Sequence, residues 1–132
     1  MPQVKGEFEV KRTPEGGFDL GGGVLAGHFR FDKQFHGALD ATGVVHMLAV
    51  GTQVDGSAAY VAIERIAGTL DGLSGAFLTQ HNGTLDRGAP TLSLTVVPDS
   101  GTDDLEGLTG RMTIDIVEGK HFYTFDYALP DA

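Results

Sequence analysis

The sequence predicts an all-β protein, a single eight-stranded antiparallel β-barrel that spans residues 1–132 as one domain with little or no helix. Twenty glycines interrupt the chain at short intervals. The runs between them are rich in β-branched and aromatic residues, and no segment repeats apolar residues at the spacing of about 3.6 that a helix requires. A chain of this length can bury a core without disulfides, and it contains no cysteine.

The candidate strands are separated by glycine-containing turns. The low-complexity segment at 15–23, EGGFDLGGG, is interpreted as a connection between the first two strands. Antiparallel strands in one sheet leave two open edges unless the sheet closes, so closure into a barrel is expected. The strands are expected at about 5–12, 26–36, 43–52, 58–68, 74–82, 91–97, 110–117 and 121–129.

The second predicted strand alternates apolar and polar residues with one exception. In HFRFDKQF, Phe29, Phe31 and Phe35 share the face expected to point inward. Lys33 shares that face, although it is charged. Either a bulge or snorkelling turns its ammonium outward, which is the favoured interpretation, or the ammonium lies at the edge of a cavity.

The last two predicted strands also alternate, around a tight reversal near Gly119. Their apolar residues then lie on one face and their polar residues on the other, as in an antiparallel sheet with one face in water. The expected cross-strand pairs are Ile116 with Tyr123, Ile114 with Phe125 and Met112 with Tyr127.

Two similar stretches, LDGLSG at 70–75 and LEGLTG at 105–110, are interpreted as corners of the sheet. Asp71-Gly72 and Glu106-Gly107 are expected to take positive φ where the chain reverses. Leu73 and Leu108 are expected to close the end of the core. The repeat therefore indicates architecture rather than chemistry.

A two-residue turn at Asp71-Gly72 would place Glu64 opposite Thr79 and His81 opposite Ala62. Tyr60, Glu64 and His81 would then share the inner face with Phe77. We expect burial to raise the pKa of the carboxyl and the carboxylate to raise the pKa of the imidazole, which makes an acid/base pair. The alternative is a turn that differs by one residue, which would point His81 at solvent.

Charge and composition exclude several kinds of partner. A net charge of −9 disfavours nucleic acid and anionic membranes, and no segment approaches the roughly 20 apolar residues of a membrane span. The N-terminus resembles no signal peptide, so the expected location is cytoplasmic. The histidines at 28, 36, 46, 81 and 121 lack the spacing of a helical or hairpin metal site. No metal or cofactor is expected, and the expected partners are small molecules or copies of the chain.

Three blocks in the sequence resemble one known family. YVAIERIAGTLDGLSGAFLTQHNGT, VVPDSGTDDLEGLTG and HFYTFDY occur in the same order in the bacterial DUF3224 family, whose fold is the allene oxide cyclase-like barrel. SGTDDLEGLTG is also similar to a stretch of dirigent and allene oxide cyclase proteins. The resemblance implies a lumen for apolar substrates and a homo-oligomer. It supplies no catalytic motif that can be matched residue by residue.

The expected function is binding of an apolar small molecule in the lumen, with cyclase or isomerase activity left open. The alternatives are a non-catalytic binder of hydrophobic ligands and a plugged barrel that acts through self-association or protein contacts. The volume of the lumen should separate them. Tyr123 and Tyr127 face the lumen, but a structural role for their hydroxyls is favoured. The candidate catalytic residues are Glu64 and His81, and the candidate ligand-binding residues are Tyr60, Tyr123, Tyr127, Phe31, Phe77 and Met47.

Overall fold

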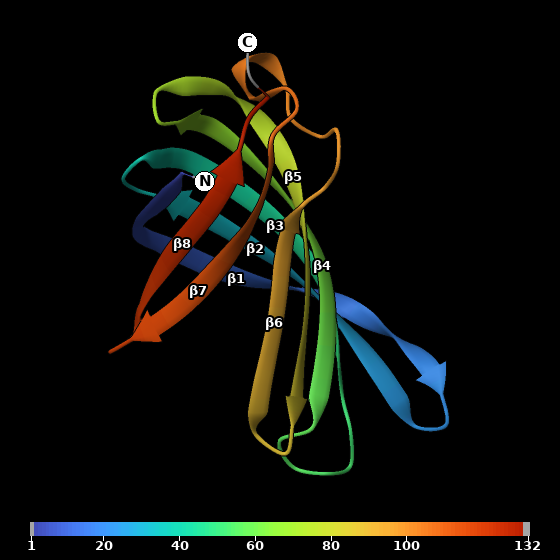
Figure 1. Cartoon of the computed structure of the whole chain (residues 1–132). Helices are drawn as coiled ribbons and strands as arrows, with labels where there is room; N and C mark the ends of the chain where they lie inside the picture. Colours follow the sequence, from blue (N-terminus) through green and yellow to red (C-terminus); the bar gives the residue numbers. More distant parts are fainter. Residues whose placement is uncertain (1, 131–132) are drawn as a thin grey trace.

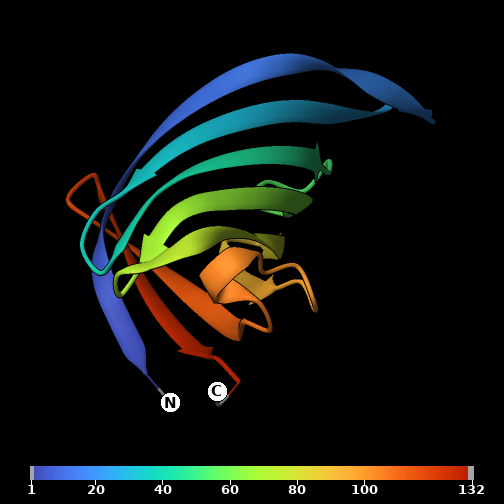
Figure 2. The ribbon, with the colours of Figure 1, turned by 90° about the horizontal axis from the view of Figure 1, so that it is seen from above.

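The computed structural model describes residues 2–130, and within them eight strands form one closed antiparallel barrel. Consecutive strands pair with one another and β1 pairs with β8, as Figure 1 and the view from above in Figure 2 show. The predicted fold class is confirmed. The elements are β1 (Gln3–Gly21), β2 (Val24–Phe35), β3 (Leu39–Gly51), β4 (Ala58–Leu70), β5 (Leu73–Asp86), β6 (Ala89–Val96), the 3₁₀ helix η1 (Asp103–Leu105), β7 (Thr109–Val117) and β8 (Lys120–Ala128).

The segment predicted as a connection at 15–23 is instead part of a long hairpin. β1 runs on to Gly21 and pairs with β2 beyond an irregularity between Pro14 and Gly17. The pairing of β1 with β8 ends at Phe8, so the far part of the hairpin projects from the barrel (Figure 1). We call residues 16–25 the arm. The prediction failed because backbone pairing with a neighbouring strand satisfies the N–H and C=O groups even where β-forming side chains are few.

The β4–β5 hairpin has the predicted turn. Asp71 and Gly72 have φ values of 49° and 80°, as a two-residue turn of type I′ requires. Glu64 consequently pairs with Thr79, and Ala62 pairs with His81. The register that puts Glu64 and His81 on the inner face is confirmed, and the alternative that points His81 at solvent is wrong.

The second copy of the repeat forms a different turn. Gly107 has a φ of 81°, but Glu106 has a φ of −58°, and Leu108 N donates to Leu105 O at 3.0 Å. These values describe a type II turn, in which only the second central residue needs positive φ. Leu108 is buried as predicted, whereas Leu73 is 37% exposed because it stands at the tip of a hairpin.

The register of β7 and β8 differs from the prediction by two residues. Met112 pairs with Phe125 and Ile114 with Tyr123, because the turn is centred on Glu118 and Gly119, which both have positive φ. A shift of two leaves every side chain on its predicted face. The error therefore changes which residues are opposite one another and leaves the inner face as predicted.

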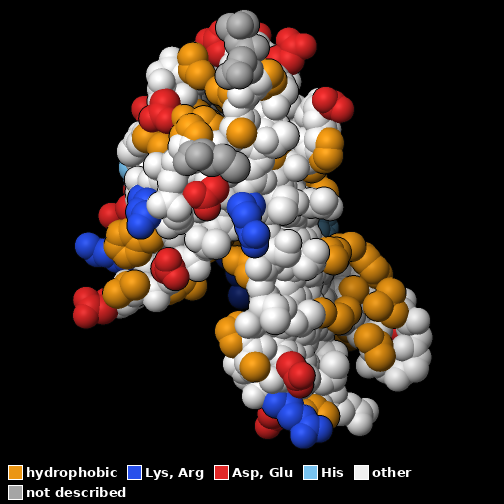
Figure 3. All heavy atoms as spheres, in the orientation of Figure 1, with side chains coloured by type: hydrophobic (Ala, Val, Ile, Leu, Met, Phe, Trp, Pro, Cys, Tyr) orange, Lys and Arg blue, Asp and Glu red, His pale blue; other side chains and the backbone are white. Residues whose placement is uncertain are grey.

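One end of the barrel is filled and the other is open. Phe35, Phe77 and Phe125 lie in the buried cluster at the filled end, with Leu70 and Leu108 beside them. β6 and β7 share a single cross-strand pair, Thr95 with Arg111, which lies next to Val96 and Met112 of the buried cluster. Towards the other end the two strands diverge, and the molecule is hollowed between them (Figure 3). No helix within residues 2–130 is long and apolar enough to span a bilayer.

Candidate functional site

Three ionisable side chains meet on the inner wall midway along the barrel. Lys33 of β2, Glu64 of β4 and His81 of β5 are all buried, and Glu64 has no exposed surface. Thr79 lies directly opposite Glu64 on β5. Strand alternation points all four side chains to the same face, so the sheet register alone brings them together.

The favoured interpretation of Lys33 is wrong. β1 and β2 pair continuously through Val10 and Lys33, and β2 and β3 through Lys33 and Gly43, so no bulge turns the side chain outward. Its side chain is 7% exposed, and its ammonium lies 3.4 Å from Glu64 Oε2. The buried carboxylate of Glu64 stabilises the ammonium, as solvent would if the side chain pointed outward. The alternative, with the ammonium at the edge of a cavity, describes the structure.

Glu64 is held by partners from two strands. His81 Nε2 lies 2.8 Å from Glu64 Oε1, and the Thr79 hydroxyl donates to the same oxygen at 3.3 Å. Lys33 Nζ lies 3.5 Å from Oε1. These interactions offset the large cost of placing a carboxylate in the protein interior.

The pKa of Glu64 lies below its ordinary value, against the expectation from burial alone. Burial raises it and is the largest single cause, but the hydrogen bonds and charges of His81 and Lys33 together outweigh burial. The prediction of a raised carboxyl pKa is therefore wrong, because it treated Lys33 as an outward-facing residue. Glu64 is ionised at neutral pH and acts as an acceptor.

The ionised carboxylate determines which nitrogen of His81 carries the proton. A carboxylate only accepts hydrogen bonds, so Nε2 must donate and a neutral imidazole keeps its lone pair on Nδ1. Glu64 Oε2 is the one fully buried side-chain polar atom in residues 2–130 without a hydrogen-bond partner, although the Lys33 ammonium lies 3.4 Å from it. His81 Nδ1 makes no hydrogen bond within these residues, and His81 lines a pocket of the barrel.

Gly43 makes room for the carboxylate, which sequence reasoning missed. A Cβ atom at Gly43 would lie 2.5 Å from Glu64 Oε2 and 3.1 Å from the Phe35 ring. Real Cβ atoms do not approach so closely, so any larger residue would displace the carboxylate or the ring. The available signal was a glycine in the middle of a strand, which is typical of a close approach.

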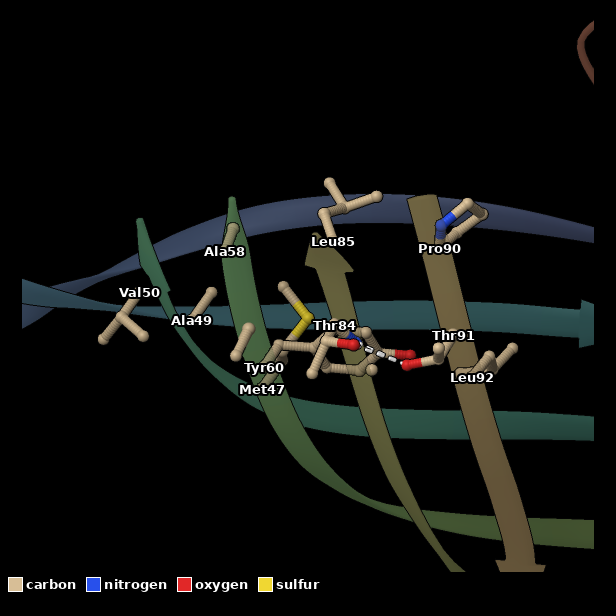
Figure 4. A pocket seen from close by; sticks show the side chains of 12 residues that line it. Met47, Ala49, Val50, Ala58, Tyr60, Thr84, Leu85, Pro90, Thr91 and Leu92 are labelled. Carbon is tan, nitrogen blue, oxygen red and sulfur yellow. Dashed lines mark hydrogen bonds between the residues drawn. The ribbon is translucent and has the colours of Figure 1, made fainter. Parts of the chain in front are cut away.

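Two neighbouring pockets occupy the open end of the barrel. One, of about 280 Å³, is lined by Lys33 and His81 together with Phe31. The other, of about 340 Å³, is almost wholly apolar and is shown in Figure 4. Met47, Tyr60 and Leu92 line both pockets. We call the two together the trough.

The Tyr60 side chain lies across Gly83 of the neighbouring strand. A Cβ atom at Gly83 would come within 2.4 Å of the Tyr60 ring, so the absence of a side chain there lets the ring lie flat against the sheet. Burial, and after it the charge of Glu64, raises the pKa of Tyr60. The phenol is therefore a neutral group at neutral pH, and it stands where the two pockets meet.

The other predicted ligand-binding residues lie outside the trough. Phe77 stacks on Phe125 in the filled end, with ring centroids 5.7 Å apart. The Tyr123 hydroxyl donates to His36 O at 2.8 Å and accepts from Leu39 N. The Tyr127 hydroxyl donates to Asp71, and burial together with this bond raises the pKa of Tyr127 to about 12. Both hydroxyls have the structural partners that the sequence analysis favoured.

The remaining histidines are apart from this cluster. His121 lines the smaller pocket next to Phe8. His28 and His46 are hydrogen-bonded to each other at 2.8 Å and exposed. Within residues 2–130 no three histidine, aspartate or glutamate side chains are grouped as metal ligands would be. Ser100 accepts from Leu78 N and donates to Val97 O, as a turn-forming residue does.

The fold and the site define the protein as an eight-stranded antiparallel barrel with a Lys–Glu–His cluster beneath an apolar trough. The chain belongs to the family described as "Protein of unknown function (DUF3224)", which matches residues 4–127. A crystal structure of a DUF3224 protein of unknown function from Shewanella oneidensis MR-1 is 45% identical, covers 99% of both chains and superposes with a TM-score of 0.93. No curated protein matches the chain.

Proposed function

We propose that the trough binds an apolar small molecule and that His81, oriented by Glu64, transfers a proton to or from it. The observation that carries the proposal is a fully buried carboxylate 2.8 Å from a histidine at the edge of an open, mainly apolar pocket. Such clusters of buried titratable groups beside a pocket are typical of functional sites. The reaction class is isomerisation or cyclisation without a cofactor.

The division of roles follows from the hydrogen bonds. Glu64 is fully buried, so it orients His81 and stabilises the imidazolium that forms when Nδ1 takes up a proton. His81 lines the pocket and can contact a ligand. Phe31 and Met47 would contact the apolar part of the ligand, and Tyr60 could donate its neutral hydroxyl.

Binding without catalysis is the second candidate function, and the larger pocket supports it. Its lining contains no ionisable group other than the Tyr60 phenol, which is typical of a site that selects a ligand by shape and apolar contact. Both candidates require the trough, and only the first requires His81.

The first test is whether the trough binds ligands at all. Native mass spectrometry of the purified protein, followed by organic extraction, would identify a bound molecule, and a panel of apolar carbonyl and polyene compounds would then be titrated calorimetrically. Met47→Trp should fill the junction of the two pockets and abolish binding. Leu48→Trp, on the opposite face of β3, should leave binding unchanged. If neither a native ligand nor any compound of the panel binds, the proposal fails.

The second test separates catalysis from binding. With a bound compound that the protein converts, His81→Ala should reduce kcat by about 100-fold or more while the Kd changes little. His28→Ala, which removes an exposed histidine from the outer face, is the matched control. Equal turnover by the wild type and His81→Ala would exclude His81 as the acid/base group and leave the binding function.

A further inference from the structure

Lys33 is the charged residue of the trough to which the proposed function gives no role. Its Nζ atom lies 5.0 Å from the centre of the Phe8 ring and 5.7 Å from that of Phe35, so the side chain is held between two aromatic residues. An ammonium has three N–H donors. Within residues 2–130, Glu64 is its only hydrogen-bond acceptor. At least one donor is therefore available to a ligand.

Lys33 and His81 border the same space. Both line the smaller pocket, and Glu64 lies behind them in contact with each, through Oε2 and Oε1 respectively. The rest of the lining is mainly apolar, including Phe31, Val45, Met47, Ala62 and Ile114. A ligand in this pocket would therefore meet a cationic donor and a base on one wall, and around them mainly hydrocarbon together with Tyr60 and His121.

The charges favour a neutral polar group on the ligand. The Glu64 carboxylate already neutralises Lys33, so with a neutral His81 the cluster carries no net charge. A ligand carboxylate would compete with Glu64 and would approach a chain of net charge −9. A carbonyl oxygen accepts a hydrogen bond from Lys33 without adding a charge, and therefore fits better.

From this arrangement we infer that Lys33 binds the carbonyl oxygen of an apolar ketone or enone, and that His81 Nδ1 removes a proton from a carbon adjacent to that carbonyl or conjugated with it. This inference rests on the proposed function and adds its substrate class. Lys33 is then a catalytic residue, because it contacts the oxygen on which negative charge develops.

The reaction balances without a cofactor. The electrons of the broken C–H bond form the C=C bond of an enolate, and the carbonyl π electrons move to the oxygen beside Lys33. The proton stays on His81, whose imidazolium is stabilised by Glu64. If the imidazolium first exchanges its proton with solvent, reprotonation of the same carbon replaces its hydrogen with one from solvent. Protonation of the far carbon of an enolate conjugated with a C=C bond moves that double bond. Nothing is oxidised, and no group leaves.

The test uses β-ionone, an apolar enone with exchangeable protons on its methyl ketone, and the corresponding alcohol, β-ionol. The wild type should bind β-ionone about tenfold more tightly than β-ionol by calorimetry. In D₂O it should also accelerate deuterium incorporation at the ketone methyl group, followed by proton NMR. Lys33→Met keeps the packing against Phe8 and Phe35 and removes the donor, so the binding preference should disappear and exchange should slow by about 100-fold.

The controls separate this inference from the proposed function. Lys11→Met removes an exposed lysine from β1 and should behave as the wild type. If Lys33→Met does not fold because Glu64 loses its partner, Lys33→Met with Glu64→Gln removes both charges and should also bind ketone and alcohol equally. Wild-type protein that binds both probes equally would overturn the inference while leaving the proposed function intact. Failure to bind either probe would overturn it as well, and failure of the whole ligand panel would overturn both.

Discussion

Among single residues, Lys33 determines the character of the site. Sequence alternation placed it on the inner face, and the general rule that lysines avoid the interior favoured an outward position. In the structure Lys33 stays on the inner face because its ammonium is paired with the carboxylate of Glu64, which lies 31 positions away in sequence. Propensity rules describe one residue and its neighbours, so they could not include a partner that the barrel brings close.

At this scale we predict how Glu64 affects the dependence of stability on pH. Its pKa is lowered in the folded state from an ordinary value of 4.5. Its contribution is therefore fully present above about pH 4.5 and is lost as the pH falls through the lower folded value. Glu64→Gln should reduce the free energy of unfolding by about 3–5 kcal/mol at neutral pH, because Lys33 stays buried without its partner.

The measurement is urea unfolding of wild type and Glu64→Gln at a series of pH values. The difference between the two proteins should shrink as the pH falls below 4.5. Glu106→Gln, which changes an exposed carboxylate, should stay close to the wild type throughout. A difference that is constant with pH would show that Glu64 is not ionised in the folded protein.

Among the elements, the β1–β2 hairpin departs most from what local sequence indicates. Its arm carries four exposed large apolar residues that Figure 3 shows gathered on one side of the projection, namely Phe18, Leu20, Val24 and Leu25. Their cross-strand partners all lie within the same hairpin, where Phe18 pairs with Ala26, Leu25 with Asp19 and Val24 with Gly21. The arm therefore contributes exposed apolar surface and little to the core.

We predict that the barrel does not need the arm. Replacing residues 18–25 with Thr-Asn-Gly keeps Ala26, which is buried and pairs with Val50. The threonine takes the place of Phe18 opposite Ala26, so Asn-Gly closes a two-residue turn without changing the register. The free energy of unfolding should change by no more than about 1 kcal/mol, and the shortened protein should aggregate less because an apolar patch is gone. Urea unfolding and light scattering check this. A loss of cooperative unfolding would show that the arm supports the barrel.

Across the whole molecule, the barrel has a filled half and an open half. The aromatic cluster and the leucines of η1 and the turn after it close one end. At the other end the trough is left open, because β6 and β7 share only Thr95 with Arg111, near the closed end, and separate beyond that pair. Both the plugged lumen and the open lumen considered from the sequence are therefore present, one at each end.

The sparse pairing between β6 and β7 predicts uneven protection from hydrogen exchange. β3 is paired on both sides along its length, from Leu39 to Gly51 with β4 and from Ala41 to Val50 with β2. Amides of β6 that face β7 should exchange at least about tenfold faster than amides in the middle of β3, because local opening costs least where pairing is sparse. Exchange followed by NMR in native conditions checks this. Equal protection of the two strands would mean that β6 and β7 are paired along more of their length in solution.

The sequence by itself determined the fold class, the inward face of most strands and the Asp71-Gly72 turn that places Glu64 and His81 together. These features depend on alternation and on turn residues, which act over a few positions of the chain. Only the tertiary structure decided that Lys33 joins them, that Gly43 admits the carboxylate and that Phe77, Tyr123 and Tyr127 fill one end while Tyr60 and Met47 line the other. These features depend on contacts between distant strands and on how the barrel tapers and opens, and no local pattern contains that information.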